Sequence, residues 1–245
     1  MDMALFNKEV SIILPAYNEA SRIEKCIKEV KQAVSSFSNS YEIIVAEDGS
    51  IDGTERILAN LSKRDPYLSL LHSPFRLGKG KAIKEALRLA KGDIVVFMDV
   101  DLSTNLNSLS DIVQMAKEKR GLAIGSRHVS GSRVQRPFVR TVFSLTYNLL
   151  ARILFLDGIH DHQCGFKAMS REIAEFVRDH VTSDGFFLDT ELILRCKKLG
   201  FKVTEIGVEW VETKRRNESV IKPFHEAVKI GLNLLRLRLR GNDLL

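Results

Sequence analysis

The sequence predicts an α/β fold, a mostly parallel, Rossmann-like sheet flanked by helices. Short apolar runs of about four to seven residues alternate with helical patterns, which is typical of parallel strands buried on both faces. Polar residues follow the ends of several of these runs, as in sheets that bind ligands at their carboxyl edge. The chain of 245 residues is 44% hydrophobic and 28% charged, the composition of one folded soluble domain.

The first strands and helices follow from apolar spacing and from turn residues. A strand over 10–14 precedes Pro15, which we expect to stop the ladder because proline donates no N–H. A helix over about 19–36 leads to a second strand over 41–46. That strand ends at Glu47, and Asp52 can cap a helix running to about residue 63.

The next elements continue the alternation of strand and helix. We expect a strand over 67–72, a helix over 79–90, a strand from Ile94 and a short strand over 121–126. The second half is less regular, and two of its segments have helical patterns. Residues 138–156 form a strongly apolar helix, and residues 222–240 form a basic amphipathic one.

The amphipathic C-terminal helix has an apolar stripe and a basic edge. The stripe consists of Phe224, Val228, Leu232, Leu235 and Leu239. Its basic residues include Lys222, Lys229, Arg236 and Arg240, and most of the net charge of +6 lies from Thr213 onward. Such a tail can bind nucleic acid, rest on an anionic membrane or pack on the domain with a solvated basic edge.

Other features of the composition exclude several classes of protein. Cys26, Cys164 and Cys196 are far apart and lack zinc-type spacing, so we expect reduced, buried thiols. No uninterrupted apolar run approaches the ~18 residues of a membrane span. The start of the chain lacks the pattern of a signal peptide, which favours a cytoplasmic protein.

Two aspartates are the strongest chemical signal. The apolar run from Ile94 to Met98 is followed by Asp99 and Asp101. Carboxylates at the end of a buried strand need a compensating cation, and oxygen ligands suit Mg²⁺ or Mn²⁺. The sequence therefore predicts a metal site that could neutralise a diphosphate leaving group.

Familiar nucleotide and calcium motifs are absent from the sequence. The run from Asp48 fails as a calcium loop because Ala59 stands where a bidentate Glu is required. No P-loop and no dinucleotide fingerprint occurs. The segment 78–81, with Lys79, could hold an anion at a helix start or could be a plain turn.

Several segments together resemble the family 2 glycosyltransferases with the GT-A fold. They are ILPAYNE at 13–19, EDGSIDGT at 47–54, the glycine-lysine turn at 78–81, MDVDLS at 98–103 and GSR at 125–127. The segments 161–172, 187–193 and 205–210 are similar to the branch that glycosylates dolichyl and other polyprenyl phosphates. The resemblance covers about 10–211, so we expect a catalytic domain over 1–211, extended by the helix within 212–245.

The resemblance implies roles for individual residues. Pro15, Tyr17, Glu19 and Asp48 would line the nucleotide pocket, and Asp99 and Asp101 would hold the metal on the diphosphate. Arg127 would lie near the transferred group, and Gln163 beside the donor sugar. The run from Gln163 to Lys167 is closer to the glucosyl group, which favours UDP-glucose over GDP-mannose. Ser103 stands where mannose synthases commonly have glutamine.

The expected reaction is an inverting transfer to a lipid phosphate. An ionised phosphate needs no general base, and Arg127, Arg136 and Arg140 are candidates to bind it. A peripheral position on the cytoplasmic face of a membrane would bring the enzyme to this acceptor. A rival family 2 enzyme with a glycan acceptor would need a base, such as Asp189 or Glu191. A nucleotide- or nucleic-acid-binding module is the rival outside enzymes, but no stacking-aromatic array supports RNA binding.

Overall fold

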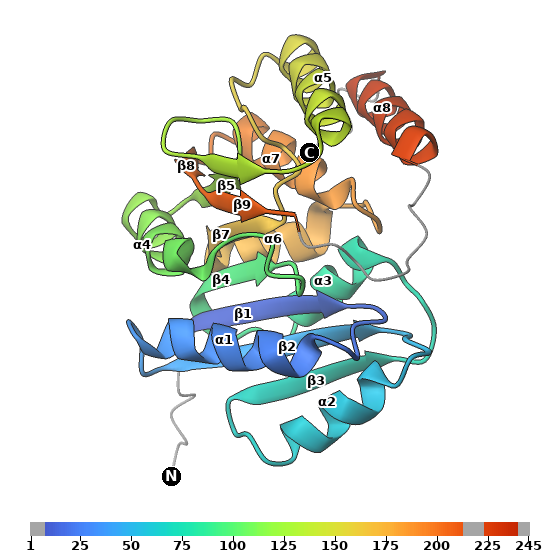
Figure 1. The fold of residues 1–245 in the computed structure, drawn as a ribbon. Coiled ribbons are helices and arrows are strands. Elements are labelled where there is room, and N and C mark those ends of the chain that lie inside the picture. The colour runs from blue at the N-terminus through green and yellow to red at the C-terminus, as the bar shows by residue number, and fades with distance from the viewer. Residues whose placement is uncertain (1–7, 213–222, 240–245) are drawn as a thin grey trace.

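The computed structural model describes residues 8–212 and the backbone of 223–239, with side chains from 231 in that last segment (Figure 1). A seven-stranded sheet has the order β3-β2-β1-β4-β7-β5-β8, and β6 pairs with β9 apart from it. The strands are β1 (Lys8–Ala16), β2 (Tyr41–Asp48), β3 (Leu68–Ser73), β4 (Gly92–Met98), β5 (Leu122–Ser126), β6 (Arg133–Gln135), β7 (Phe166–Ser170), β8 (Val203–Gly207) and β9 (Glu209–Val211).

Helices cover both faces of the sheet. They are α1 (Ile23–Ser35), α2 (Thr54–Ser62), α3 (Lys79–Leu87), η1 (Leu106–Ser108), α4 (Leu109–Lys119), α5 (Phe138–Phe155), α6 (Arg171–His180), α7 (Leu188–Lys198) and α8 (Pro223–Leu239). One core cluster joins α1, α2 and α4 to one face, and a second joins α3, α6 and α7 to the other. The predicted α/β fold with helices on both faces is therefore confirmed.

The sheet is mostly parallel, as predicted, with one antiparallel strand. β7 lies between β4 and β5 and is antiparallel to both. The chain runs from β1 to β2 and β3 on one side, then resumes at β4 on the other side of β1. Ligands of open α/β sheets bind beyond the carboxyl ends of the strands at such a point.

The predicted end of the first strand is wrong. β1 continues through Pro15, which pairs in register with Ala46 of β2. The pairing of β1 with β4 already ends at Ile13, so a proline this near the strand end interrupts little of the ladder. The first helix begins at Ile23 rather than at residue 19, because Glu19 takes part in the preceding turn.

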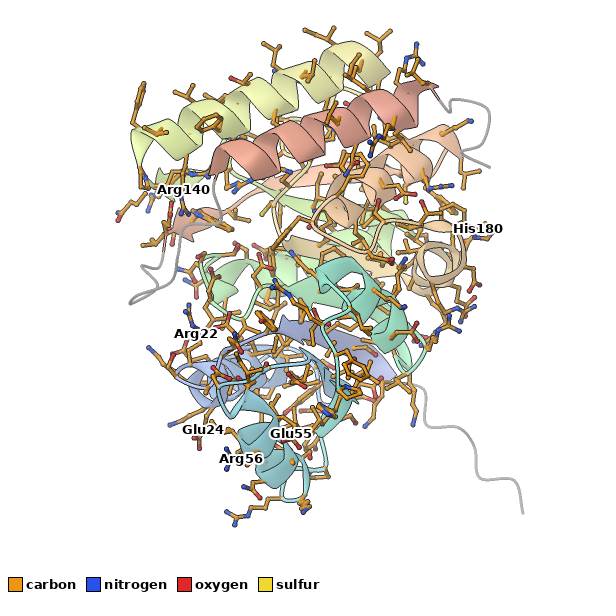
Figure 2. All side chains as sticks on the ribbon, turned by 90° about the vertical axis from the view of Figure 1, so that its right-hand side faces the viewer. Arg22, Glu24, Glu55, Arg56, Arg140 and His180 are labelled. Atoms are coloured by element: carbon orange, nitrogen blue, oxygen red, sulfur yellow. The ribbon has the colours of Figure 1, made fainter. Side chains whose placement is uncertain are left out.

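The predicted helices over 138–156 and 222–240 correspond to α5 and α8, which lie side by side at one end of the sheet (Figures 1 and 2). The described part of α8 packs through Leu234 and Leu237 against α5 and α7. Leu232, Leu235 and Leu239 of the predicted stripe are exposed instead. Phe224, Val228, Lys222, Lys229 and Arg240 lie outside the described side chains, so the amphipathic face and the division at residue 211 remain predictions.

The sequence-based expectation of no segment long enough to span a membrane needs correction. α5 has 18 residues with a mean hydropathy of 1.2, which is long and apolar enough by those two criteria, and only 17% of it is buried. A search for uninterrupted apolar runs misses it because Arg140, Ser144, Asn148 and Arg152 interrupt the run. Length and composition alone do not distinguish a span from a helix lying on a surface.

The three cysteines are free and buried, as predicted. Burial raises the pKa of the Cys196 thiol to about 12. Burial likewise raises the pKa of Cys164 to about 12, with the charge of Asp161 adding to the effect. These thiols are therefore protonated at neutral pH and act as small core side chains.

Candidate active site

The carboxyl edge of the sheet collects the polar residues that the sequence singles out. Asp99 and Asp101 come directly after β4, and Tyr17 and Glu19 come directly after neighbouring β1. Asp48 ends β2 in a buried position. Because β1, β2 and β4 are parallel, these groups meet at one edge, at the point where strand order reverses.

Asp99 is joined to a row of alternating charges. The Nζ atom of Lys79 lies 2.8 Å from Oδ1 of Asp99 and 3.3 Å from Oδ2 of Asp189. The other oxygen of Asp189 lies 2.7 Å from Nζ of Lys167, whose side chain is fully buried. The row Asp99, Lys79, Asp189 and Lys167 therefore holds two negative and two positive charges.

Burial and the charge of Lys79 act on the pKa of Asp99 in opposite directions. Burial raises the pKa of Asp99 against the charge of Lys79, and nearby Asp101 raises it further. Burial opposes protonation of Lys79, yet the charges of Asp189 and Asp99 raise its pKa. The Asp99 side chain keeps 36% of its surface exposed, so it can still meet a ligand.

A glycine makes room for Asp99. Gly165, just before β7, lies so close that a Cβ atom added to it would be 2.1 Å from Oδ2 of Asp99. The amide of Asp99 also donates to the carbonyl of Gly165 over 3.2 Å. Any larger residue at 165 would have to push the carboxylate away.

Asp99 and Asp101 fit a divalent cation. Both supply carboxylate oxygens, and Asp99 already takes a cation, the Lys79 ammonium, on Oδ1. Asp101 also accepts from the amide of Ser103 over 3.0 Å. No group of three His, Cys, Asp or Glu side chains gathers for a metal within the described parts of the chain. An ion here would therefore share its coordination with oxygens of a bound ligand.

The loops around the predicted nucleotide pocket are tied by backbone amides. Asp48 accepts from the amide of Leu77 over 2.5 Å and from that of Gly78 over 3.0 Å. The amides of Gly80 and Lys81 donate to the carbonyl of Asp184. The amides of Gly78, Gly80 and Lys81 are thus already partnered, which favours the plain-turn interpretation of 78–81. The Lys79 side chain remains the contribution of this segment to the site.

The loop after β1 is fastened to the loop after β2. The amide of Glu19 donates to Oγ1 of Thr54 over 2.8 Å, and its carboxylate pairs with Arg22 at 2.7 Å. The guanidinium of Arg76 covers the Tyr17 ring at 3.9 Å from its centroid. Contacts of Pro15, Tyr17, Glu19 and Asp48 with a nucleotide remain predictions.

Arg127 forms an ion pair with the buried carboxylate of Asp161. Its Nε and Nη2 atoms lie 2.7 and 2.8 Å from the two oxygens of Asp161, and its guanidinium lies 4.8 Å from the Trp210 ring centroid. Burial opposes ionisation of Asp161, but the charge and hydrogen bonds of Arg127 bring its pKa below the ordinary value. The predicted contact of Arg127 with an acceptor therefore competes with a bidentate ion pair.

Arg136 is differently placed. Its Nε and Nη1 atoms are buried and have no hydrogen-bond partner among the residues that the structure describes. Burial lowers its pKa, and the charge of Arg127 lowers it further.

Arg140, labelled in Figure 2 at the start of α5, is half exposed and pairs with Glu212. Gln163 is half-buried, and its backbone amide donates to the carboxylate of Asp161.

The two candidate bases are both engaged. Asp189 contacts Lys79 and Lys167, as described above. Glu191 accepts from the amides of Thr182 and Ser183 and from Nε of Arg195 at 2.7 Å. Burial opposes ionisation of Glu191, but hydrogen bonds from the Ser183 hydroxyl, the Thr182 amide and Arg195 hold its pKa below the usual range. The contacts favour a structural role for Glu191, fixing an arginine.

Sequence reasoning assigned no role to Gly165, Lys167 or Asp161. A lysine inside an apolar strand pattern and an acid directly before His162 were available signals. Both residues are fully buried, where an unpaired charge would be costly, so each could have suggested an ion pair. Gly165 carries no signal without knowledge of where Asp99 lies.

An open α/β sheet with a carboxylate pair at its switch point is the arrangement expected from the resemblance to the GT-A glycosyltransferases. The chain belongs to the family described as glycosyl transferase family 2, whose model matches residues 11–178. This confirms the family that the sequence resembles. It also places the protein among enzymes.

Individual relatives sharpen this assignment. The chain is 37% identical to glycosyltransferase AglD of Haloferax volcanii over 93% of its own length, but spans only 36% of that relative. It is 31% identical to dolichyl-phosphate beta-glucosyltransferase ALG5D of Trichomonas vaginalis, over 93% of this chain and 72% of the relative.

Solved structures show the same fold. Glucosyl-3-phosphoglycerate synthase of Mycobacterium tuberculosis, crystallised with Mn²⁺, UDP-glucose and phosphoglyceric acid, is 23% identical with a TM-score of 0.68. The match covers 94% of this chain and 79% of that one. At this identity the likeness concerns the GT-A fold alone.

Proposed function

We propose that this protein transfers a hexose from a nucleotide sugar, with UDP-glucose the favoured donor, to dolichyl or another polyprenyl phosphate. The observation that carries the proposal is the position of Arg136, a half-buried arginine whose Nε and Nη1 atoms are buried without a hydrogen-bond partner among the described residues. The charge of Arg127, directly after β5, lowers the pKa of Arg136, and Arg136 lies two residues before the exposed apolar helix α5. An anion-binding group beside an apolar surface suits a phosphate on a lipid chain.

The donor half of the proposed reaction rests on Asp99 and Asp101. With Mg²⁺ or Mn²⁺ these residues would hold the diphosphate, and the ion would neutralise the charge that develops on the leaving group. Relatives named dolichyl-phosphate beta-glucosyltransferase and the Mn²⁺ and UDP-glucose of the solved neighbour support this choice of donor and cofactor. GDP-mannose is the alternative donor.

The acceptor half needs cations rather than a base. The second pKa of a phosphate monoester is about 6, so the acceptor is already ionised near neutral pH. Arg136 and Arg140 would draw it to the face of the sugar opposite the diphosphate, and attack on the anomeric carbon would invert its configuration. The engaged contacts of Asp189 and Glu191 make the rival with a glycan acceptor less favoured.

The lipid acceptor implies a position at a membrane. We propose peripheral attachment to the cytoplasmic face through the exposed apolar side of α5 and the basic C-terminal segment. Each Lys or Arg near an anionic surface contributes about 1 kcal/mol, so the attachment would weaken with salt. Nucleic acid is not a partner in this proposal.

Radiolabelled transfer tests the proposal. UDP-glucose, UDP-GlcNAc and GDP-mannose are each incubated with polyprenyl phosphate in detergent, with and without EDTA. We expect label from UDP-glucose to enter the lipid fraction, EDTA to stop it, and Mg²⁺ or Mn²⁺ to restore it. Asp101→Ala, checked for folding, should be nearly inactive. Label that enters only a glycan, or no label from any donor, would overturn the proposal.

A further inference from the structure

Helix α5 turns one narrow polar face toward the active site. Within the helix, Ser144, Asn148 and Ala151 are buried, and Tyr147 lies between them on the same face. Ser144, Tyr147 and Asn148 each hydrogen-bond to a residue directly beside a candidate site residue in the chain. The three contacts reach three separate segments.

The contacts are specific. Oγ of Ser144 lies 3.2 Å from Nε2 of His128, the neighbour of Arg127. The Tyr147 hydroxyl lies 2.7 Å from Oγ1 of Thr190, the neighbour of Asp189. Asn148 contacts His162, which lies between Asp161 and Gln163.

Asn148 makes two contacts with a single residue, His162. Its Oδ1 accepts from the amide of His162 over 3.0 Å and also faces Nδ1 of the ring at 3.1 Å. The other ring nitrogen lies 2.7 Å from Asp157, so this fully buried histidine is held from two sides. The Nδ2 atom of Asn148 is buried without a partner in the described residues. Packing alone would favour an apolar residue at position 148. We therefore infer that Oδ1 of Asn148 serves to position His162.

The opposite face of α5 is apolar and exposed. Its exposed side chains include Phe138, Val139, Val142, Leu145, Leu149 and Ile153. Two arginines, Arg140 and Arg152, lie on the same helix near its ends. A long apolar face with cationic ends suits the surface of a lipid bilayer containing anionic lipids.

We propose that Ser144, Tyr147 and Asn148 are positioning residues that couple the seating of α5 on a lipid bilayer to the order of the active site. Among the described residues, these side-chain hydrogen bonds join α5 to each of the three segments. A bilayer that holds α5 in one orientation would therefore fix His128, Thr190 and His162, and with them Arg127, Asp189 and Gln163. The coupling rests on the proposed lipid-phosphate acceptor.

Vesicles of phosphatidylcholine and phosphatidylglycerol, with geranyl phosphate as a short, water-soluble acceptor, test the coupling. For the unaltered protein, added vesicles should raise kcat with UDP-glucose about threefold to tenfold, the worth of one hydrogen bond, and leave KM for UDP-glucose nearly unchanged. Hydrogen exchange at the amides of 157–165 should slow on the vesicles. Flotation measures binding separately.

Variants separate positioning from simple packing. Tyr147→Phe and Asn148→Leu should bind vesicles as before but lose the stimulation and the slowed exchange. Asn148→Asp keeps an oxygen facing His162 and should retain both effects. Thr146→Ala changes an exposed hydroxyl on the same helix and is the matched control. Thermal unfolding identifies any variant that has lost its fold, and Tyr147→Phe is the mildest change.

The outcomes are distinguishable. Stimulation of Tyr147→Phe and Asn148→Leu equal to that of the unaltered protein would overturn the coupling. Vesicle binding without slower exchange at 157–165, or no vesicle binding at all, would overturn it too. If no donor supports transfer yet vesicles slow that exchange in the unaltered protein and not in Asn148→Leu, the coupling stands and the proposed function fails.

Discussion

The active site has a first half, built from segments up to β4, and a second half, built from segments from β5 onward. Several carboxylates of the two halves are held by different means. In the first half, Asp48 and Asp52 accept from backbone amides of neighbouring loops. In the second half, Asp161, Asp189 and Glu191 each pair with a buried or nearly buried cationic side chain. The amide-held carboxylates fix the backbone of loops, whereas the ion-paired ones fix charged side chains.

The difference predicts unequal sensitivity to mutation. Removing a carboxylate from an amide pair leaves backbone groups that water near the surface can still reach. Removing a carboxylate from a buried ion pair leaves the cationic partner buried without a compensating charge. The second half should therefore tolerate loss of its acids poorly, although it also contains the exposed apolar helix α5.

Asp161→Asn is the sharpest test of this comparison. It leaves the guanidinium of Arg127 buried, with its side chain only 7% exposed, opposite a neutral amide. Breaking a buried pair in this way costs about 3–5 kcal/mol of unfolding free energy. Urea denaturation measures the loss. A cost as small as that of Asp52→Asn would break the comparison.

The same pair predicts a pH dependence. Arg127 holds the pKa of Asp161 below its unfolded value of about 3.9, against the effect of burial. The stabilisation is then complete at pH 7 and is lost progressively as the pH falls below about 4. The unfolding free energy of the unaltered protein should fall more steeply from pH 5 to pH 2 than that of Asp161→Asn. Parallel curves would show that the ion pair contributes nothing.

Gly165→Ala tests the link from the second half to the metal site. The new Cβ would overlap the Asp99 carboxylate, which must move. A displacement of about 1 Å can cost a hundredfold in rate, so transfer should fall by about that factor while thermal unfolding changes little. Gly185→Ala is the control, because nothing lies within 4 Å of a Cβ at that position. Equal activity of the two variants would mean that Asp99 does not depend on Gly165.

The halves also differ in how far the sequence predicts them. Strands β1 to β4 are apolar runs bounded by turn residues, so their positions and the site of Asp99 and Asp101 follow from local patterns. β7 was not predicted, because its run contains Lys167 and its place between β4 and β5 depends on long-range pairing. The partners of Lys79, Arg127 and Asn148 also lie outside their local sequence, from 14 to 110 residues away, so no local pattern indicates them.

Asp48→Ala tests the amide-held half. It removes an acceptor of the Leu77 and Gly78 amides, with an expected loss of about 1.5–3 kcal/mol in unfolding free energy because the acceptor is charged. If Asp48 also contacts the nucleotide, calorimetry should show weaker binding of UDP with no change for the acceptor. Asp52→Ala, another amide-held acid, is the matched control. Equal UDP affinity in both variants would make Asp48 a loop former alone.

Arg140→Ala should have the smallest effect on stability. Its pair with Glu212 is half exposed, and such pairs contribute about 0–1 kcal/mol. Its expected effect is on the acceptor, because it carries a cation at the start of the apolar helix α5. The concentration of polyprenyl phosphate for half-maximal transfer should rise roughly tenfold, while that of UDP-glucose stays constant. Arg133→Ala, which removes another exposed arginine paired with an acid, should change neither. Equal shifts for donor and acceptor would place Arg140 outside acceptor binding.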